Sequence, residues 1–521
     1  MTESGRALNV AVIGAGAAGL VAARELQREG HSVQVYENSP GLGGIWNYQE
    51  EIEDDLLGRD PHRHIVHSSL YASLRVNLPR EIMSYTDFPF IPEAMAGRSK
   101  DARRFPHHTE VLAYLEAFAD QFDLRPLIRF DTQVVRLEQS MQPHNHAEHE
   151  QDRDCSGQTQ VPKRQTVQAG WRVISEPASS AERQEGHAKQ TEEEFEAVVV
   201  AIGNYHEPNL PDIAGMDAFP GLQLHCHNFR HNEPFRDQRV LVVGASYSGI
   251  ELANHVADVA QRVFHSARTW GSNNDPEQTK PNLERVPMLT HLSPDASASF
   301  GDGQSISNID SVIYCTGYQY KYRFLEHLNL ISTDEMHVHP LYKHIFVPSV
   351  APTLAFIGLL WKSLRNIQFE TQVRWVAQVL SGKAILPSEA AMMEDVNGFY
   401  TLRAEHGVPL RYTHCQTAGM PVTQWEYNED LRQACHPPPP PAEQWRVDLH
   451  EQSASKILGE PNTFRDAVTP EDEAHFERAR AACLQMWQQL QALSSSQHCK
   501  RVTEQLAAKH ADGALLRACQ T

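Results

Sequence analysis

The stretch Val10–Glu37, VAVIGAGAAGLVAARELQREGHSVQVYE, decides the fold of this 521-residue chain. Its first four residues are apolar and predict a buried parallel strand. The turn that follows places Gly14, Gly16 and Gly19 at G-x-G-x-x-G spacing, ahead of a helical run from Leu20 to Glu29. A strand, a glycine-rich turn and a helix in this order predict the start of an α/β unit that binds a dinucleotide.

Each glycine of this turn has its own expected role. Gly14 permits the tight turn, Gly16 lets the backbone approach a pyrophosphate, and Gly19 lets the helix pack closely on the sheet. The phosphates are expected at the free N–H groups of the helix N-terminus. A second predicted strand ends before Glu37, whose carboxylate can bind both ribose hydroxyls. Because strand, helix, second strand and acid arrive in order, we favour dinucleotide binding over a structural glycine-rich turn.

The composition limits the classes of partner. The formal net charge is −20, from 66 acidic and 46 basic residues, which argues against nucleic acid or an anionic membrane surface. The eight cysteines are scattered and form no CxxC pair, which suits a reducing compartment. No secretory signal precedes the first strand, and the longest apolar run, near Leu354–Trp361, is too short to span a bilayer. We therefore expect a cytoplasmic protein without a membrane span.

Two further stretches are expected near the nucleotide. The turn NSPGLGGIWNY, residues 38–48, is rich in glycine and would bring Trp46 back toward a flat ligand such as a flavin. Asn77 stands two residues before Pro79, whose ring favours extended backbone at Leu78, so the Asn77 side chain is presented from a rigid turn. The alternatives are a surface turn with a buried tryptophan and an ordinary turn asparagine.

The composition changes between residues 139 and 194, where Gln, His, Glu and Ser predominate. The strand-like segment Gly170–Ser175 interrupts this region, so we expect a hairpin with long solvated loops. His144, His146 and His149 lie in the region and are residues of a metal-binding type. In a polar, low-complexity loop we expect no metal site.

A second strand–turn–helix unit begins at Arg239–Val243, RVLVV, and continues in GASYSG, residues 244–249. Its match is looser because Ser246 replaces the middle glycine. The second strand of this unit ends in Ser266-Ala267-Arg268, without the acid that selects NAD. A hydroxyl and a guanidinium fit a 2′-phosphate, so the unit predicts NADPH binding. A structural role for Arg268 is the alternative.

Two later segments carry further structural signals. Ser311–Tyr318 is an apolar strand that ends in Thr316 and Gly317. Residues from Thr469 onward predict a capped helix with one apolar stripe. We expect this stripe to dock on the body of the protein, and a homodimer contact is the alternative. The stripe consists of Phe476, Ala479, Cys483, Met486, Trp487 and Leu490.

The segment between the two units carries a family fingerprint. Phe219, Gly221, His225 and Phe229 fit the pattern F-x-G-x-x-x-H-x-x-x-F, so the chain resembles the flavin-containing monooxygenases. The related Baeyer–Villiger enzymes usually have Trp at the last position of the pattern, where this chain has Phe229. The likeness extends to the glycine-rich turn that ends at Trp46.

Four further stretches are similar to the plant S-oxygenating branch of that family, which includes the glucosinolate S-oxygenases. They are HSSLYASLRVNLPREIMSYTDFPF at 67–90, NEPFRDQ at 232–238, LYKHIF at 341–346 and LPSEAAMMED at 386–395. The resemblance runs from about Asn9 to Arg465 and excludes the 139–194 region.

The resemblance implies an α/β fold with two Rossmann-like dinucleotide-binding domains, the NADPH domain being inserted in the FAD domain. The FAD domain would comprise residues 1–208, with the hydrophilic insertion 139–194, and residues 309–450. The NADPH domain would comprise residues 209–308, and residues 451–521 would form a C-terminal helical extension.

The resemblance also implies the reaction. NADPH would reduce FAD, and the reduced flavin would form a C4a-hydroperoxyflavin with O₂ that oxygenates a soft nucleophile, the sulfur or nitrogen of a small molecule. Asn77 would be the catalytic residue at the junction of flavin and nicotinamide, where its amide can donate and accept. The alternatives are an N-hydroxylating or Baeyer–Villiger enzyme, and a flavoprotein sensor or scaffold without turnover. A disulfide reductase would need a redox cysteine pair beside the flavin, which the sequence does not offer.

The residues expected to bind the two cofactors come from the glycine-rich turns, the Asn77 loop and the end of the 311–318 strand. They are Gly14, Gly16, Ala17, Ala18, Gly19, Glu37, Gly44, Ile45, Trp46, Val76, Asn77, Leu78, Gly244, Ser246, Ser248, Gly249, Arg268, Thr316 and Gly317.

Overall fold

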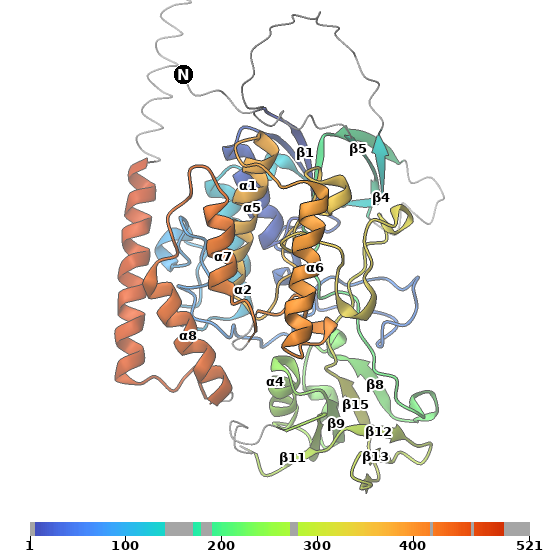
Figure 1. Ribbon diagram of the computed structural model, residues 1–521. Coiled ribbons are helices and arrows are strands. Elements are labelled where there is room, and N and C mark those ends of the chain that lie inside the picture. Colours follow the sequence, from blue (N-terminus) through green and yellow to red (C-terminus); the bar gives the residue numbers. More distant parts are fainter. Residues whose placement is uncertain are drawn as a thin grey trace, which may run out of the picture.

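The computed structural model describes residues 6–140, 170–178, 190–270, 280–416, 420–459 and 463–493. In these residues the chain forms two five-stranded parallel sheets and two three-stranded antiparallel sheets. Figure 1 shows one parallel sheet with its helices in the upper part of the view and the other below it. The expected α/β class with parallel sheets is therefore confirmed.

The first parallel sheet has its earliest strand at the centre, which is the order of a dinucleotide-binding fold. Val12 of this central strand lies opposite Val35 on one side and Val199 on the other. The strands are apolar on both faces because helices pack on one face and an antiparallel sheet, which includes residues 132–140 and 170–177, packs on the other. From one edge to the other the strands are β16 (Leu354–Phe356), β7 (Ala197–Val200), β1 (Asn9–Ile13), β2 (Ser32–Tyr36) and β3 (Ile128–Arg129).

The second parallel sheet has the same kind of centre, a strand followed directly by a glycine-rich turn and helix α4 (Tyr247–Val256). A small antiparallel sheet of β12 (Leu289–Leu292), β13 (Ala298–Phe300) and β14 (Ser305–Ile306) lies next to it in Figure 1. The parallel strands, in order, are β11 (Leu283–Val286), β10 (Arg262–Ser266), β9 (Arg239–Val243), β15 (Ser311–Tyr314) and β8 (Leu222–His225).

Two expected boundaries are wrong. Strand β15 pairs with β9 and β8, so the chain is still in the second sheet after residue 309, where the first sheet was expected to resume. An apolar strand pattern does not reveal which sheet the strand joins, and this explains the error. The C-terminal extension was expected to begin at residue 451, but helix α8 (Gln444–Gly459) already begins at Gln444.

The expected hairpin is present. Strand β4 (Thr132–Ser140) pairs with β5 (Gly170–Pro177), which pairs with β6 (Thr191–Phe195) in a three-stranded antiparallel sheet. Strand β6 ends at Phe195 and β7 begins at Ala197, and the two strands belong to different sheets. His144, His146 and His149 lie outside the described residues.

Helices cover the first sheet and form one side of the molecule. Helix α1 (Ala17–Arg28) packs against α5 (Arg365–Ser381), and α5 packs against α7 (Gln424–Gln433). The other long helices are α2 (His108–Gln121) and α6 (Glu389–Glu405). No helix in the described ranges is long and apolar enough to cross a bilayer.

Short 3₁₀ helices are η1 (Gly44–Trp46), η2 (Pro92–Ala94), η3 (Arg125–Leu127), η4 (Met216–Ala218), η5 (Cys226–Asn228), η6 (Glu233–Phe235), η7 (Glu326–Leu328), η8 (Asp334–Met336), η9 (Pro348–Val350) and η10 (Leu410–Tyr412).

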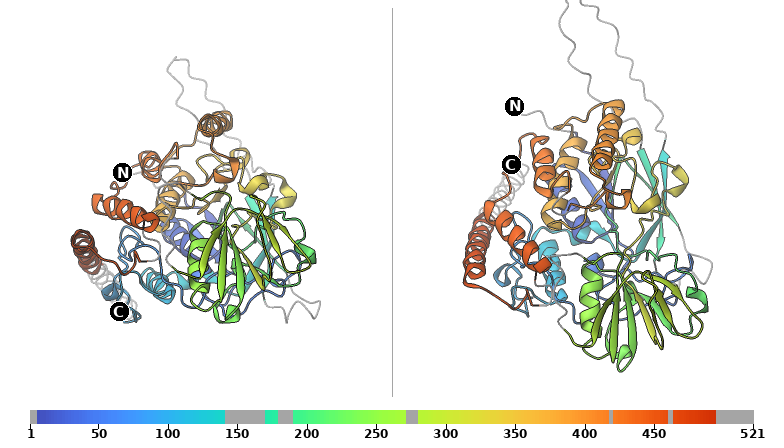
Figure 2. Two further views of the ribbon diagram at one scale, coloured as in Figure 1. Left: turned by 90° about the horizontal axis from the view of Figure 1, so that it is seen from below. Right: turned by 60° about the horizontal axis from the view of Figure 1, so that its bottom comes forward.

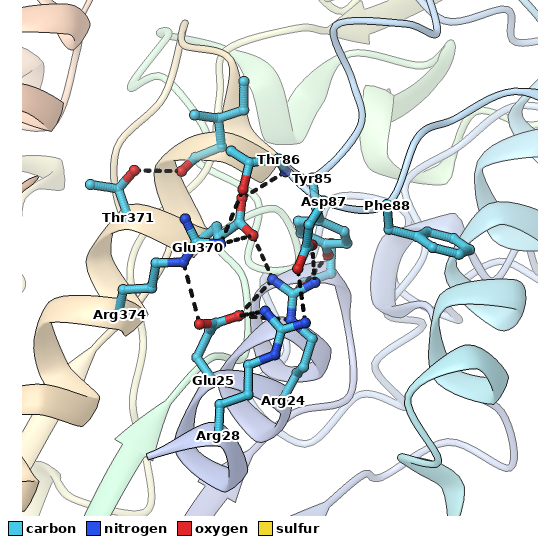
Figure 3. Close-up of polar contacts among 12 residues, drawn as sticks. Arg24, Glu25, Arg28, Tyr85, Thr86, Asp87, Phe88, Glu370, Thr371 and Arg374 are labelled. Atoms are coloured by element: carbon cyan, nitrogen blue, oxygen red, sulfur yellow. Dashed lines mark hydrogen bonds and ion pairs between the residues drawn. The ribbon is translucent and has the colours of Figure 1, made fainter. Parts of the chain in front are cut away.

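A buried cluster of charges fastens α1 to α5 (Figure 3). Arg24 on α1 is 2% exposed and contacts Glu370 on α5, while its Nη1 donates to Asp87 at 2.7 Å. Arg374 on α5 reaches back to Glu25 on α1 at 3.3 Å. Because breaking a buried ion pair leaves an uncompensated charge, this cluster fixes the two helices relative to each other.

The expected docking of the final helix is confirmed. Residues 470–493 are helical, and Figures 1 and 2 show this helix at one side of the molecule, next to α8. Thr469 caps it, since its hydroxyl accepts from the N–H of Asp472 at 3.2 Å. The guanidinium carbon of Arg104 lies 3.9 Å from the ring centroid of Phe476, and the ring of Trp487 contacts the ring of Phe88. The apolar stripe therefore covers the loop between β2 and α2.

Candidate active site

One connected cavity of about 2260 Å³ runs from the first glycine-rich turn to the second. Pockets for a single small ligand have volumes of about 300–1,000 Å³, so this cavity has room for more than one. Its walls include the residues that follow β1, β2, β7 and β16 in the first sheet and β9, β10 and β15 in the second. The carboxyl ends of parallel strands are where α/β folds bind ligands.

Most of the residues expected to bind cofactors line this cavity. Three do not: Gly19 and Gly249 lie behind the two turns, and Val76 is buried in the core at 2% exposure. Those that line it are Gly14, Gly16, Ala17, Ala18, Glu37, Gly44, Ile45, Trp46, Asn77, Leu78, Gly244, Ser246, Ser248, Arg268, Thr316 and Gly317.

The first glycine-rich turn has the geometry of a phosphate cradle. Gly14 has a φ of +103°, and a Cβ there would lie 2.6 Å from the carbonyl oxygen of Ala201. A Cβ on Gly19 would lie 1.8 Å from the carbonyl oxygen of Gly14, so Gly19 permits α1 to pack on β1. Gly16 precedes α1 without a side-chain cap, which leaves the first N–H groups of the helix for a ligand.

The glycine-rich turn at residues 38–48 packs against the turn that contains Gly14 and Gly16. The N–H of Gly43 donates to the carbonyl of Ala15 at 2.9 Å, and a Cβ on Gly44 would lie 3.0 Å from the Cα of Gly16. The close approach holds the 3₁₀ turn Gly44–Trp46 against the cradle, where Trp46 lines the cavity. The expectation that Trp46 returns toward the nucleotide site agrees with this placement.

Glu37 is held by the protein. Its Oε2 accepts from the N–H of Ala15 at 2.7 Å, and its Oε1 accepts from the N–H and the hydroxyl of Ser39 at 2.9 and 2.7 Å. A carboxylate has about four acceptor positions, so about one is free for a ribose hydroxyl. The carboxylate thus fixes the glycine turn and also faces the cavity.

The glycine-rich turn of the second unit follows the same backbone path. Gly244 has a φ of +112°, and a Cβ on Gly249 would lie 1.8 Å from the carbonyl oxygen of Gly244. Ser246, at the position of the missing glycine, has φ −86° and ψ −178°, close to the φ −72° and ψ −175° of Gly16. This extended conformation suits any residue, so the serine causes no strain. Ser246 also leaves α4 without a side-chain cap.

The part of the 2′-phosphate prediction that used a hydroxyl is wrong. The hydroxyl of Ser266 donates to the carbonyl of Pro287 and accepts from the N–H of Leu289, both at 2.8 Å, and Ser266 is 1% exposed. Arg268 is exposed, lines the cavity and has no carboxylate partner in the described chain. Thr269 lies beside it in the cavity wall. The guanidinium of Arg268 remains the group that can receive an anion.

Asn77 is half-buried in the wall between the two turns. The backbone just before it is fixed, because the N–H of Val76 donates to the carbonyl of Pro106 at 2.9 Å. Arg465, from the segment after α8, donates from Nε to the carbonyl of Val76 at 2.9 Å. Its Nη2 donates to Glu251 of α4 at 2.7 Å, so one side chain links the Asn77 loop to the second unit.

Several cavity residues were not expected from the sequence. The rings of His67 and His206 stack with centroids 5.5 Å apart, and burial lowers the pKa of both, so they are neutral at pH 7. His206 lies in the loop after β7, and the position of that loop at a strand end was the available signal. Trp361, from the segment after β16, and Arg365, the first residue of α5, also line the cavity.

The family fingerprint contributes to the fold and lies outside the cavity wall. Phe219 and Phe229 are buried on different faces of the second sheet. A Cβ on Gly221 would lie 2.4 Å from the carbonyl oxygen of Asp310. His225 is fully buried and its ring contacts Tyr318. The residues of the fingerprint therefore contribute to the packing of the second sheet.

Comparison with known proteins agrees with this geometry. The family model described as flavin-binding monooxygenase-like matches residues 7–273 and 286–437. The chain belongs to the flavin-binding monooxygenase-like family. It is therefore a flavin-containing monooxygenase with FAD and NADPH as cofactors, as the sequence predicted.

Several similar relatives are plant proteins. Flavin-containing monooxygenase FMO GS-OX-like 2 of Arabidopsis thaliana is 42% identical over 88% of this chain and 91% of its own length. Flavin-containing monooxygenase FMO GS-OX5 of the same plant is 41% identical over the same shares. The structure of S-allyl-L-cysteine S-oxygenase from Allium sativum matches with a TM-score of 0.80 at 35% identity, covering 92% of this chain and 100% of that one. The predicted likeness to the plant S-oxygenating branch is confirmed.

Proposed function

We propose that the protein is an NADPH- and O₂-dependent S-oxygenase that converts a small thioether to its sulfoxide. The observation that carries the proposal is that two uncapped glycine-rich turns and Asn77 face one cavity. The names of the S-oxygenase relatives, at 35–42% identity, support sulfur as the oxygenated atom. The free cysteines of the described chain support a reducing cytoplasm as its location.

The residues present fit FAD on the first unit and NADPH on the second. The pyrophosphate of FAD would lie on the N–H groups at the start of α1, and its ribose would meet Glu37. The pyrophosphate of NADPH would lie at the start of α4, and its 2′-phosphate would meet Arg268. When bound, the flavin takes hydride from NADPH and activates O₂, which is the chemistry that side chains cannot supply.

Asn77 positions the reacting groups in this proposal. Its amide has one acceptor and two donor positions, and it makes no hydrogen bond to another described side chain or backbone group. It can therefore donate to one ring system and accept from another between the two turns. The rigid backbone around it, held by Pro106 and Arg465, keeps the amide in place.

The rest of the wall excludes water. Leu78, Met83, Trp361 and Phe369 line the cavity together with Asn77. Activated oxygen is lost as hydrogen peroxide when water reaches it, so an apolar wall favours transfer to the substrate. A thioether sulfur is itself the nucleophile and needs no general base, so the proposal requires only shape and polarity from this wall.

The test is a product assay with purified holoenzyme, NADPH and air. A thioether, a tertiary amine and a cyclic ketone are supplied in separate reactions, and product is measured against NADPH consumed. The proposal predicts that the thioether gives sulfoxide with the highest kcat/KM. Preferential formation of an N-oxide, or of a lactone from the ketone, would contradict it and indicate an N-oxygenating or Baeyer–Villiger enzyme.

A further inference from the structure

Two cysteines that are far apart in the sequence are neighbours at the end of the second sheet. Strands β8 and β15 are parallel, with His225 opposite Tyr314. Cys226 and Cys315 each follow their strand by one residue. Neighbouring strands are about 4.7–4.9 Å apart, which falls within the Cα separation of about 4.4–6.8 Å that a disulfide requires.

The two thiols also face each other. Cys226 begins η5 and Cys315 follows β15, and the two thiols are close enough to affect each other's ionisation. Both cysteines are free, at 7% and 6% exposure, and both line the cavity. A small reagent inside the cavity can therefore reach a thiol pair that is shielded from the outer surface.

The surroundings make the two sulfurs unequal. The hydrogen bond from Cys315 lowers the pKa of the Cys226 thiol, and the same contact raises the pKa of Cys315. Nδ1 of His225 lies 4.0 Å from Sγ of Cys226 and accepts from the N–H of His227 at 3.2 Å. A thiolate beside a neutral thiol is the arrangement in which the first sulfur reacts and the second resolves the product.

We propose that Cys226 and Cys315 are a peroxide-sensitive thiol pair that closes to an intramolecular disulfide. The thiolate of Cys226 attacks one oxygen of hydrogen peroxide, the O–O bond breaks, and the departing hydroxide takes up the proton that Cys226 lost on ionisation, which forms water. The sulfenic acid on Cys226 is then attacked by the sulfur of Cys315, which forms the S–S bond and releases a second water. Two thiols and one peroxide thus give one disulfide and two waters. A flavin monooxygenase releases this oxidant whenever oxygen reduction is not coupled to product.

The pair lies directly behind the second glycine-rich turn. A Cβ on Gly244 would lie 2.3 Å from the carbonyl oxygen of Cys315 and 3.5 Å from its Cβ. A disulfide at this point changes the backbone against which the turn rests. The enzyme would therefore bind NADPH more weakly after it has released peroxide, which limits further wasteful turnover.

The test uses the holoenzyme and added hydrogen peroxide, so it does not depend on which substrate the enzyme oxygenates. After exposure the protein is denatured in N-ethylmaleimide, digested and analysed by mass spectrometry. We expect a peptide pair joined through Cys226 and Cys315 that dithiothreitol separates, and a several-fold higher Kd for NADPH that dithiothreitol restores. The variant Cys315→Ser should instead show a sulfenic acid on Cys226 that dimedone traps.

Cys435→Ser is the matched control, because Cys435 is also buried but its thiol donates to the carbonyl of Leu431 in α7, the helix that ends two residues before it. This variant should form the same cross-link as the wild type. The proposal is overturned if both Cys226 and Cys315 carry N-ethylmaleimide after peroxide treatment, or if either joins another cysteine instead. Loss of S-oxygenase activity in the product assay would leave this result unchanged, so the two proposals fail separately.

Discussion

Arg465 is ion-paired to Glu251, with Nη2 2.7 Å from Oε1, and the same guanidinium holds the backbone next to Asn77. The segment after α8 therefore connects the Asn77 loop to the helix that begins at the second glycine-rich turn. Glu251 itself lines the cavity. In the proposed enzyme this contact would fix the position of the Asn77 loop relative to the NADPH-binding unit.

Replacing Arg465 with alanine should uncouple the enzyme. The substitution removes hydrogen bonds from a charged donor, each with a value of about 1.5–3 kcal/mol, and frees the loop that carries Asn77. We expect FAD to remain bound while the hydrogen peroxide formed per NADPH rises. Arg480→Ala is the control, since Arg480 pairs with Glu93 on the exterior at a distance from the cavity wall. Equal coupling in the two variants would contradict the role of Arg465.

Replacing Asn77 with alanine should uncouple the enzyme more strongly than Arg465→Ala does. The backbone of this loop is held by neighbouring residues, so the fold and the bound FAD should be retained. The substitution removes the amide that we propose lies between the two ring systems, so NADPH should be oxidised with little sulfoxide formed. Parallel measurement of NADPH, sulfoxide and peroxide checks this. A variant with full coupling would show that Asn77 only completes the wall.

Arg268→Ala tests the choice of nicotinamide cofactor. Loss of a charge-assisted contact of about 1.5–3 kcal/mol corresponds to an increase of about 10- to 100-fold in the KM for NADPH. The KM for NADH should change little, because NADH has no 2′-phosphate. Arg262→Ala is the control, as Arg262 pairs with Glu284 on the second sheet and lies outside the cavity wall. An equal change for both cofactors would refute the assignment.

Gly19→Ala should prevent stable folding of the first unit. A Cβ at Gly19 would lie 1.8 Å from the carbonyl oxygen of Gly14, so α1 must move off β1. We expect a large fall in Tm and loss of FAD. Gly398→Ala is the control, because Gly398 lies within α6 with no atom within 4 Å of its added Cβ. That change should be neutral or stabilising by about 0.5–1 kcal/mol. Similar Tm values for the two variants would show that the glycine spacing at α1 is not a packing requirement.

The sequence predicts features that are encoded within about thirty consecutive residues. The turn at Gly14 and the second turn at Gly244 are each flanked by their own strand and helix, so both units were predictable. The assignment of β15 to a sheet was not, because the partner of a parallel strand is distant in the chain. For the same reason the sequence did not indicate that Cys226 lies beside Cys315, or that Arg465 binds the backbone of Val76 next to Asn77.

The spectrum of the purified protein under anaerobic conditions tests the central claim, that FAD and NADPH bind at two turns facing one cavity. The protein should be yellow from bound FAD, and NADPH should bleach the flavin band in a single fast phase, while NADH at the same concentration should bleach it far more slowly. A colourless protein that takes up no added FAD, or a bound flavin that NADPH does not reduce, would contradict the account.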